Sequence, residues 1–238
     1  MIQHRRTDLA TLRVKEIFQT IQGEGPLSGE PCVFVRLEGC NLKCWFCDTD
    51  FENGRQMHVA QILGEVEALM PDSPLGKKPL CVLTGGEPFA QDITVLVTSL
   101  LGRKWRVQIE TAGTLWCDLP EDSDLDIVCS PKTPNVHPRI MDRATAWKYL
   151  IRLEDAFDPA DGLPYSVTQD QKEAGGQEPQ AKDAYPIAKP KMRAEVFLQP
   201  VEEINADMTD RNVTEAVRRA MRFGYRLSLQ QHKILGLQ

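Results

Sequence analysis

Three cysteines, Cys40, Cys44 and Cys47, lie within eight residues of the sequence. Thiolates are soft ligands that suit iron–sulfur clusters and zinc. A closed structural metal site normally has four protein ligands, and no fourth cysteine lies near these three. Because one iron of a 4Fe-4S cluster would then lack a protein ligand, the spacing favours a cluster that takes a further ligand from outside the protein.

S-Adenosylmethionine can fill that position through its amino and carboxylate groups. One-electron reduction then cleaves its sulfonium bond and leaves a deoxyadenosyl radical, chemistry that the cofactor itself supplies. The aromatic pair Trp45-Phe46 can shield the cluster. Downstream, the glycines of Gly85-Gly86-Glu87-Pro88 allow the backbone to approach the methionine end of the cofactor, and we expect Glu87 to bind its ammonium group.

The alternative for the cysteines is a zinc knuckle with His58 or a distant cysteine as the fourth ligand, in a binding module without catalysis. Short motifs produce false matches, so the triplet alone leaves zinc open. The Gly85–Pro88 segment favours the iron–sulfur cluster.

Short apolar runs alternate with segments of helical periodicity, which is the pattern of a mostly parallel α/β sheet. The predicted strands are 14–18, 32–38, 80–84, 106–110, 126–129, 147–151, 195–198 and 226–229. The predicted helices are 58–70, 92–101 and 212–223, and in the last of these the inward residues are Val213, Ala216, Val217, Ala220 and Met221.

Polar clusters follow five of the predicted strands. They are Thr84–Pro88, Glu110-Thr111, Ser130–Lys132, Gln199-Pro200 and Gln231–Lys233. The carboxyl ends of parallel strands are where α/β sheets and barrels bind ligands. The sequence therefore predicts one site at this edge of the sheet.

The chain has 238 residues and a formal net charge of −6. We expect one α/β domain, because this length buries one sizeable core. The acidic balance argues against nucleic acid as a partner. No secretory signal and no membrane-length apolar run are visible, so we expect no membrane contact and a cytoplasmic protein.

The remaining cysteines, Cys32, Cys81, Cys117 and Cys129, are expected to be small core residues with reduced thiols. Residues 154–193 are polar and rich in Pro, Gly, Gln, Asp and Lys, so we interpret them as a flexible insertion late in the chain. Residues 1–12 are expected to form a tail to the domain 1–238.

Beyond these features, the chain resembles the radical S-adenosylmethionine superfamily, and more closely its 7-carboxy-7-deazaguanine synthase family of the queuosine pathway. The resemblance is carried by 15–25, 40–51, 84–88, 109–111, 130–132, 198–200 and 226–233. The cysteine spacing is common to the superfamily, whereas Gln22-Gly23-Glu24-Gly25 and the carboxy-terminal segment narrow the match.

The resemblance implies a modified partial (β/α) TIM-like barrel of the radical SAM type. It implies conversion of 6-carboxy-5,6,7,8-tetrahydropterin to 7-carboxy-7-deazaguanine with loss of ammonia. The implied cofactors are a 4Fe-4S cluster, S-adenosyl-L-methionine and Mg²⁺. The implied partners are the pterin, an electron donor such as flavodoxin, and a second copy of the chain in a homodimer.

The resemblance also assigns the site residues. The pterin contacts are Ile21, Gln22, Gly23, Glu24, Arg36, Thr84, His232 and Gln238. The cofactor contacts are Phe46, Cys47, Asp48, Gly86, Glu87, Ser130, Pro131, Lys132, Gln199, Pro200, Val201 and Glu202. The metal ligands are Cys40, Cys44 and Cys47 for the cluster and Thr49 for magnesium.

Several of these assignments have plain alternatives. Arg36 and Glu38 can form an exposed strand pair, Thr49 can cap a turn, and His232 can be a solvated side chain. Ala112 stands where the family pattern has asparagine. A glycyl-radical-enzyme activase shares the cysteine spacing and the partial barrel, and it is the second enzymatic hypothesis.

Overall fold

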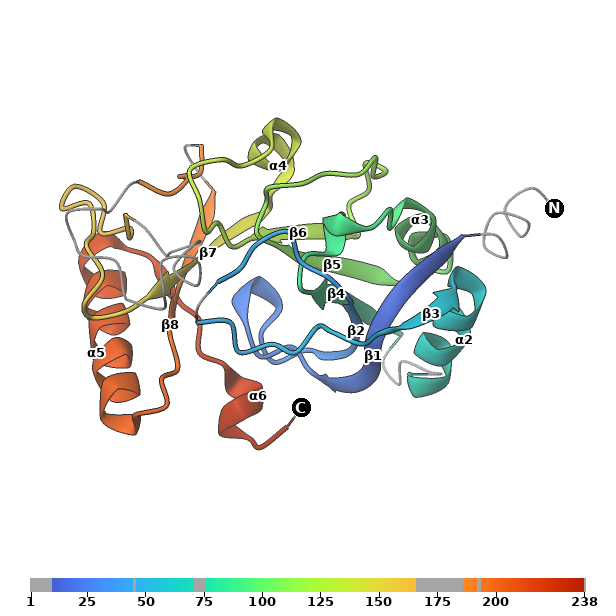
Figure 1. The fold of residues 1–238 in the computed structure, drawn as a ribbon, viewed down its shortest axis with the longest axis horizontal. Helices are drawn as coiled ribbons and strands as arrows, with labels where there is room; N and C mark the ends of the chain where they lie inside the picture. Colours follow the sequence, from blue (N-terminus) through green and yellow to red (C-terminus); the bar gives the residue numbers. More distant parts are fainter. Residues whose placement is uncertain (1–9, 45, 71–75, 166–185, 192–193, 238) are drawn as a thin grey trace.

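The computed structural model describes residues 10–44, 46–70, 76–165, 186–191 and 194–237. In this part of the chain nine strands form one curved sheet, in the order β3-β1-β2-β4-β5-β6-β7-β8-β9 (Figure 1). The strands are β1 Thr11–Ile21, β2 Pro31–Leu37, β3 Arg55–His58, β4 Leu80–Gly85, β5 Arg106–Thr111, β6 Leu125–Cys129, β7 Ala146–Ile151, β8 Glu195–Pro200 and β9 Arg226–Leu227.

The strands pair in parallel along the order β2-β4-β5-β6-β7-β8-β9, whereas β1 is antiparallel to both β2 and β3. This is the partial barrel that the sequence predicts, and all eight predicted strands are confirmed. The prediction missed β3, because Arg55-Gln56-Met57-His58 is short and has one apolar side chain; it pairs with Thr11–Val14 of β1.

The longer helices cover one face of the sheet, whereas the short α6 Gln231–Ile234 lies by the turn after β1 (Figure 1). The other helices are α2 Val59–Leu69, α3 Thr94–Gly102, α4 Pro138–Arg143 and α5 Ala206–Phe223, with single 3-10 turns at Gly25–Leu27 and Pro88–Ala90. Helices α2 and α3 lie at one end of the molecule and α5 lies at the other (Figure 1).

Helix α5 begins six residues before its predicted start, where the Asn205 side chain accepts a hydrogen bond of 2.9 Å from the backbone N–H of Asp207. The prediction that Met221 faces inward is wrong, because its side chain is 81% exposed. Arg219 is fully buried instead. Its guanidinium donates to Glu215 and lies over the ring of Phe157. A charged pair therefore occupies part of the side of α5 that packs against the rest of the protein.

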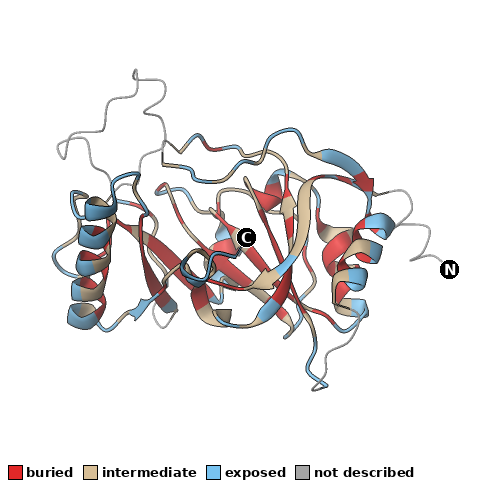
Figure 2. Cartoon of the chain, turned by 90° about the horizontal axis from the view of Figure 1, so that it is seen from below, coloured by how far each residue is buried: buried red, intermediate tan, exposed pale blue. Residues whose placement is uncertain are grey.

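Most residues of the central strands are buried (Figure 2), and alternation along the strands puts their side chains on both faces of the sheet. The layer under the helices includes Val35, Leu83, Ile109 and Trp147. The opposite layer, here called the inner face, holds two small apolar clusters, Cys32, Leu80, Val82 and Val128, Ala146, Phe197. By the same alternation, the inner face becomes polar near the carboxyl ends of the strands, with Arg36, Thr84, Glu110, Lys148 and Gln199.

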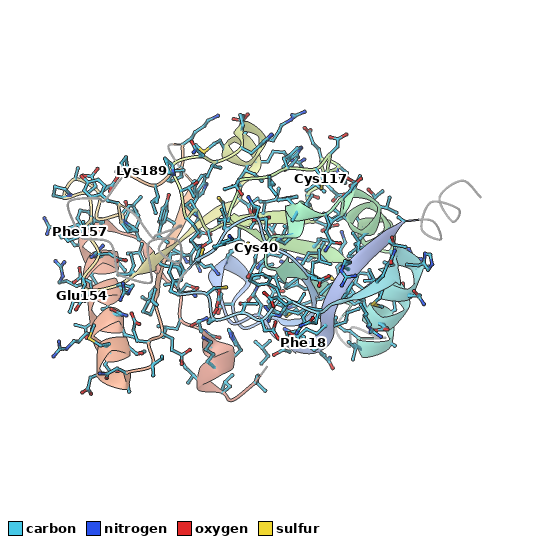
Figure 3. The ribbon with its side chains drawn as sticks, viewed as in Figure 1. Phe18, Cys40, Cys117, Glu154, Phe157 and Lys189 are labelled. Atoms are coloured by element: carbon cyan, nitrogen blue, oxygen red, sulfur yellow. The ribbon has the colours of Figure 1, made fainter. Side chains whose placement is uncertain are left out.

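The segment between β7 and β8 is the predicted insertion, and its two described ends pack against the protein. Leu163 and Ile187 are buried in the main core. Lys189 bonds Asp158 and Asp161 at 2.6 Å each, near the α5 end of the molecule (Figure 3). The expectation of flexibility therefore fails for these ends, and residues 166–185 lie outside the described residues.

The predicted tail also needs correction, because Thr11 and Leu12 belong to β1 and Leu12 is buried. Among the described helices, none combines the length and the apolar character that a membrane crossing requires.

Candidate active site

The cysteine loop packs directly on the Gly85–Pro88 turn after β4. The backbone N–H of Glu87 donates to the carbonyl of Gly39 at 2.8 Å. A Cβ on Gly86 would overlap the Gly39 carbonyl and lie 2.7 Å from Cys40 Cβ, so only glycine fits this contact. The two motifs that the sequence singled out for the cofactor are therefore neighbours, and Cys40 lies toward the middle of the molecule (Figure 3).

The three thiols lie close enough to influence one another. The backbone N–H of Cys47 donates to the carbonyl of Cys44 at 3.3 Å, and Cys47 is exposed while Cys40 is half-buried. Burial raises the pKa of the Cys40 thiol to about 11, and Glu87, Cys44 and Cys47 add to the rise. A metal centre binding here would release the thiol protons.

Three thiols are soft donors that suit an iron–sulfur cluster. Within the described ranges, no three His, Cys, Asp or Glu side chains are gathered as a site for a single metal ion. A four-iron cluster binds each thiolate to a different iron, so its ligands spread over a wider space. His58, the proposed zinc ligand, caps helix α2, with its backbone N–H donating to Gln61 Oε1 at 2.9 Å.

Glu87 is fully buried, and both of its carboxylate oxygens are bonded within the protein. One oxygen accepts from Thr111 Oγ1 at 2.7 Å and from the Phe89 N–H at 3.1 Å, and the other accepts from the Ala112 N–H at 2.8 Å. Burial raises the pKa of this carboxyl despite those bonds. Glu87 therefore braces the turn, and its expected contact with the cofactor ammonium stays a prediction that would require displacing one of these bonds.

Hydrogen bonds of its own side chains and backbone hold the turn that follows β1. The Gln22 side chain is buried, accepts from the Glu24 N–H at 3.0 Å and donates to Glu110 Oε1 at 3.0 Å. Gly25 N–H donates to Ser228 Oγ at 2.9 Å, which ties this turn to the chain after β9. Gln22 thus shapes the turn, and its predicted direct contact with the pterin stays a prediction.

Glu24 is the centre of a polar group on the inner face. Its Oε2 pairs with Lys148 Nζ, and its Oε1 accepts from Gln230 at 2.8 Å and from Gln199 at 3.3 Å. Burial alone would raise the pKa of Glu24, but Lys148, Gln230 and His232 outweigh burial and lower it. Glu24 is therefore a carboxylate inside the barrel.

Arg36 and Thr84 are register partners near the carboxyl ends of β2 and β4. Arg36 Nε donates to Glu16 Oε1 at 2.6 Å, and its guanidinium lies 5.9 Å from the ring centroid of Phe18. Glu38 instead pairs with Arg13, so the alternative of an Arg36–Glu38 pair is wrong. Ile21, also predicted to contact the pterin, ends β1 and pairs with Pro31 at the start of β2, away from the carboxyl ends that hold Arg36 and Thr84.

Lys132 forms hydrogen bonds within the segment that follows β6. Lys132 Nζ donates to the Ser130 carbonyl at 2.7 Å and to Ser130 Oγ at 2.6 Å. Burial lowers the pKa of Lys132. Pro131 is buried between them, and the Ser130 N–H donates to the Thr111 carbonyl at 2.7 Å, so this segment adjoins the Glu87 brace.

The carboxy-terminal segment covers the same edge. The Gln231 N–H donates to the Gly23 carbonyl at 3.1 Å, and a Cβ on Gly23 would overlap the His232 ring. Lys233 Nζ bonds Asp48 at 2.8 Å and Glu202 at 2.5 Å. His232 is thus packed on the Gly23 turn, and its predicted contact with the pterin stays a prediction.

The remaining predicted residues lie around this edge. Thr49 is half-buried and donates to Asp48 Oδ1 at 3.3 Å, and Phe46 packs against the main core. Pro200 ends β8, and Val201 donates its N–H to the Ile151 carbonyl at 3.0 Å. Trp45 and Gln238 lie outside the described residues.

Sequence reasoning missed Lys148 and the side chain of Gln108, and it did not assign a role to Glu110. Gln108 and Gln22 both donate to Glu110 Oε1, at 3.2 Å and 3.0 Å. A signal for Lys148 was present, because it is the only charged residue in the apolar run Ala146–Ile151.

Comparisons with known proteins agree with this geometry. The family model of the radical SAM superfamily matches residues 34–155. The 7-carboxy-7-deazaguanine synthase of Rhodospirillum rubrum is 43% identical, covering 96% of this chain and 93% of that protein. The synthase of Rickettsia prowazekii is 38% identical, covering 97% and 91%.

A solved structure shows the same fold at lower sequence identity. QueE from Escherichia coli matches with a TM-score of 0.64 and 21% identity, covering 97% of this chain and 98% of that chain. The cysteine loop, the Gly85–Pro88 turn and the closing tail are assembled at one sheet edge, and the two synthases match this chain over nearly their full length. The chain therefore belongs to the 7-carboxy-7-deazaguanine synthase family of radical SAM enzymes.

Proposed function

We propose that the protein converts 6-carboxy-5,6,7,8-tetrahydropterin to 7-carboxy-7-deazaguanine with loss of ammonia. The proposal rests on one observation, which is that two groups of residues lie next to each other. The cysteine loop and the inner-face polar group around Glu24 share one sheet edge, and the segment with His232 packs over the Gly23 turn there. A small planar substrate held by Glu24 would lie under that segment and beside the cofactor.

The cofactor site combines the cluster loop with three other segments. A bound 4Fe-4S cluster with S-adenosyl-L-methionine would supply a deoxyadenosyl radical. The residues that would hold these groups are Cys40, Cys44, Cys47, Phe46, Asp48, Gly86, Glu87, Ser130, Pro131, Lys132, Gln199, Pro200, Val201 and Glu202. Hydrogen bonds support this assignment. Gly86, Ser130 and Glu202 belong to segments that bond one another or the carboxy-terminal segment.

The pterin would be held from the β1 turn and the inner face. Arg36 offers a guanidinium whose fork suits the 6-carboxylate, and its present partner Glu16 lies on the neighbouring strand. Thr49 would provide an oxygen ligand to Mg²⁺ together with oxygens of the substrate, as hard cations prefer. Ile21, Gln22, Gly23, Glu24, Thr84, His232 and Gln238 complete the proposed substrate site.

The cellular setting is also part of the proposal. We infer a cytoplasmic enzyme that takes electrons from a donor such as flavodoxin and that acts as a homodimer. The exposed Cys47 supports electron entry at the outer side of the cysteine loop.

An anaerobic assay tests the function. Protein reconstituted with iron and sulfide, given S-adenosylmethionine, a chemical reductant and the carboxy-tetrahydropterin, should form 7-carboxy-7-deazaguanine and ammonia, with faster turnover when Mg²⁺ is added. The same pterin without its 6-carboxylate is the control and should not be converted. Deoxyadenosine release without deazaguanine would overturn the assignment of the substrate while leaving the radical chemistry intact. Stable capture of a large protein substrate would then favour the activase.

A further inference from the structure

Lys148 is a buried cation in the middle of an apolar strand. Its neighbours Trp147 and Tyr149 face the core under the helices, whereas Lys148 is 6% exposed on the inner face. Replacing a buried ion pair by packed apolar side chains is often neutral or stabilising. Stability alone therefore gives no reason for a lysine at this position.

The partner of Lys148 is held from three directions. Lys148 on β7 pairs with one oxygen of Glu24, and Gln199 on β8 and Gln230 before α6 bond the other. These bonds fix one orientation of the carboxylate. Gln199 Oε1 is buried and, within the described part of the chain, accepts no hydrogen bond. An acceptor without a donor thus lies beside the carboxylate.

The charges around the pair favour its ionised form. Glu110 on β5 and Asp48 in the cysteine loop act on Lys148 together with Glu24, Lys132 after β6 and His232 in α6 act on Glu24, and Lys132 also repels Lys148 as a like charge. Burial opposes the charge on Lys148, but Glu24 and then Glu110 outweigh burial, and the pKa of Lys148 is raised. Both members of the pair are charged over the neutral pH range.

We propose that Lys148 is a positioning residue that keeps Glu24 ionised and aimed at the N–H donors of the substrate's pyrimidine ring. This rests on the proposed function. A pterin presents ring and amino N–H groups along one edge, and a fixed carboxylate with the free Gln199 carbonyl offers acceptors to match. Lys148 acts through Glu24 and need not touch the substrate.

The test is binding of the carboxy-tetrahydropterin to anaerobic, cluster-loaded protein with S-adenosylmethionine and no reductant, measured by calorimetry from about pH 6 to about pH 8. Wild-type affinity should be flat over this range. In Lys148→Met the unpaired, buried Glu24 should have a raised pKa, so affinity should fall roughly tenfold or more at the acidic end and recover as pH rises. The double variant Glu24→Gln/Lys148→Met should bind weakly without pH dependence.

Lys191→Met is the matched control, because Lys191 pairs with Asp142 on the surface away from this group and should bind as wild type does. If Lys148→Met does not fold, Lys148→Arg replaces it, and the proposal expects weaker but pH-independent binding. Wild-type affinity in Lys148→Met, equal loss at every pH in that variant, or a new pH dependence in Lys148→Arg would overturn the positioning role alone. A wild-type protein that fails to bind the pterin would overturn the proposed function as well.

Discussion

At the scale of single residues, Gly86 packs directly on Gly39 and Cys40. Backbone approaches backbone there, so the position of the first cluster ligand depends on the absence of a side chain at residue 86. Glu87 fixes the same turn through three hydrogen bonds. The geometry of the cysteine loop is therefore set by the turn after β4 as well as by the loop itself.

Gly86→Ala should prevent normal cluster assembly, because its Cβ would overlap the Gly39 carbonyl and crowd Cys40. Iron and sulfide content after anaerobic reconstitution, with visible absorption, is the measurement. Gly64→Ala is the control, because its Cβ meets no atom within 4 Å in helix α2, and it should stabilise the fold by about 0.5–1 kcal/mol. Full iron loading of Gly86→Ala would contradict this reading of the turn.

The sequence alone identified single site residues where uncommon residue types recur at a characteristic spacing. The cysteine triplet and the Gly85–Pro88 turn were predicted and are neighbours in the structure. Lys148 and Glu110 were not assigned, because their partners Glu24 and Gln22 lie on the turn after β1, which only the folded chain brings to the inner face. Glu87 was expected to meet the cofactor, but burial and internal bonds that a sequence does not display give it a bracing role.

At the scale of elements, two connections hold the site together. The carboxy-terminal segment is tied to the Gly23 turn, to Asp48 and to Glu202. Helix α5 is tied to the chain on both sides of the 154–193 segment by Asn212, which is fully buried. Element types followed from periodicity, whereas β3 and the start of α5 were missed because polar pairing and capping leave a weak apolar signal.

Lys233→Met should weaken binding of S-adenosylmethionine, because it frees the tail from Asp48 and Glu202. The lysine is partly exposed, so the loss should be modest, about 0–1 kcal/mol, and largest at low salt. Equilibrium binding of the cofactor at two salt concentrations measures it. Unchanged affinity at low salt would show that these ion pairs do not hold the tail over the cofactor segments.

Asn212→Ala should destabilise the protein by about 1–3 kcal/mol, because it leaves the Leu153 N–H and the Val201 carbonyl without partners in a buried place. Urea unfolding of the metal-free chain measures the change. Thr214→Ala on the exposed side of the same helix is the comparison and should lie near wild type. Equal stability of the two variants would mean that Asn212 does not anchor α5.

At the scale of the whole molecule, one mostly parallel sheet brings residues that are far apart in the sequence to a single edge. The sequence predicted this architecture because strand periodicity is local and the position of a ligand site follows from parallel topology. It did not predict that the ends of the 154–193 segment pack against the core, because Leu163 and Ile187 are isolated apolar residues in a polar stretch.

The pH dependence of stability belongs to this scale. Hydrogen bonds from Arg218 and Arg219 hold the pKa of Glu215 below its usual value against the effect of burial, and Lys189 lowers the pKa of Asp158. A carboxyl with a lowered folded-state pKa stabilises the protein above its unfolded-state pKa, and the stabilisation is lost as pH falls through the folded-state pKa. The free energy of unfolding should therefore fall with acidification below the ordinary carboxyl range.

Glu215→Gln should lower stability at neutral pH, because it leaves the buried Arg219 without its carboxylate, and it should flatten the acidic fall. Denaturant unfolding at a series of pH values gives both quantities for the variant and the wild type. An acidic fall of the same slope in both would show that Glu215 does not contribute to it.

The central claim is that three neighbouring thiolates hold a cluster whose radical chemistry is directed at the pterin. Anaerobic turnover of 6-carboxy-5,6,7,8-tetrahydropterin by wild type and by Cys44→Ala, under identical reconstitution, tests it most directly. We predict 7-carboxy-7-deazaguanine from the wild type and neither deoxyadenosine nor deazaguanine from Cys44→Ala. Deazaguanine formation by the alanine variant, or none by an iron-loaded wild type, would contradict it.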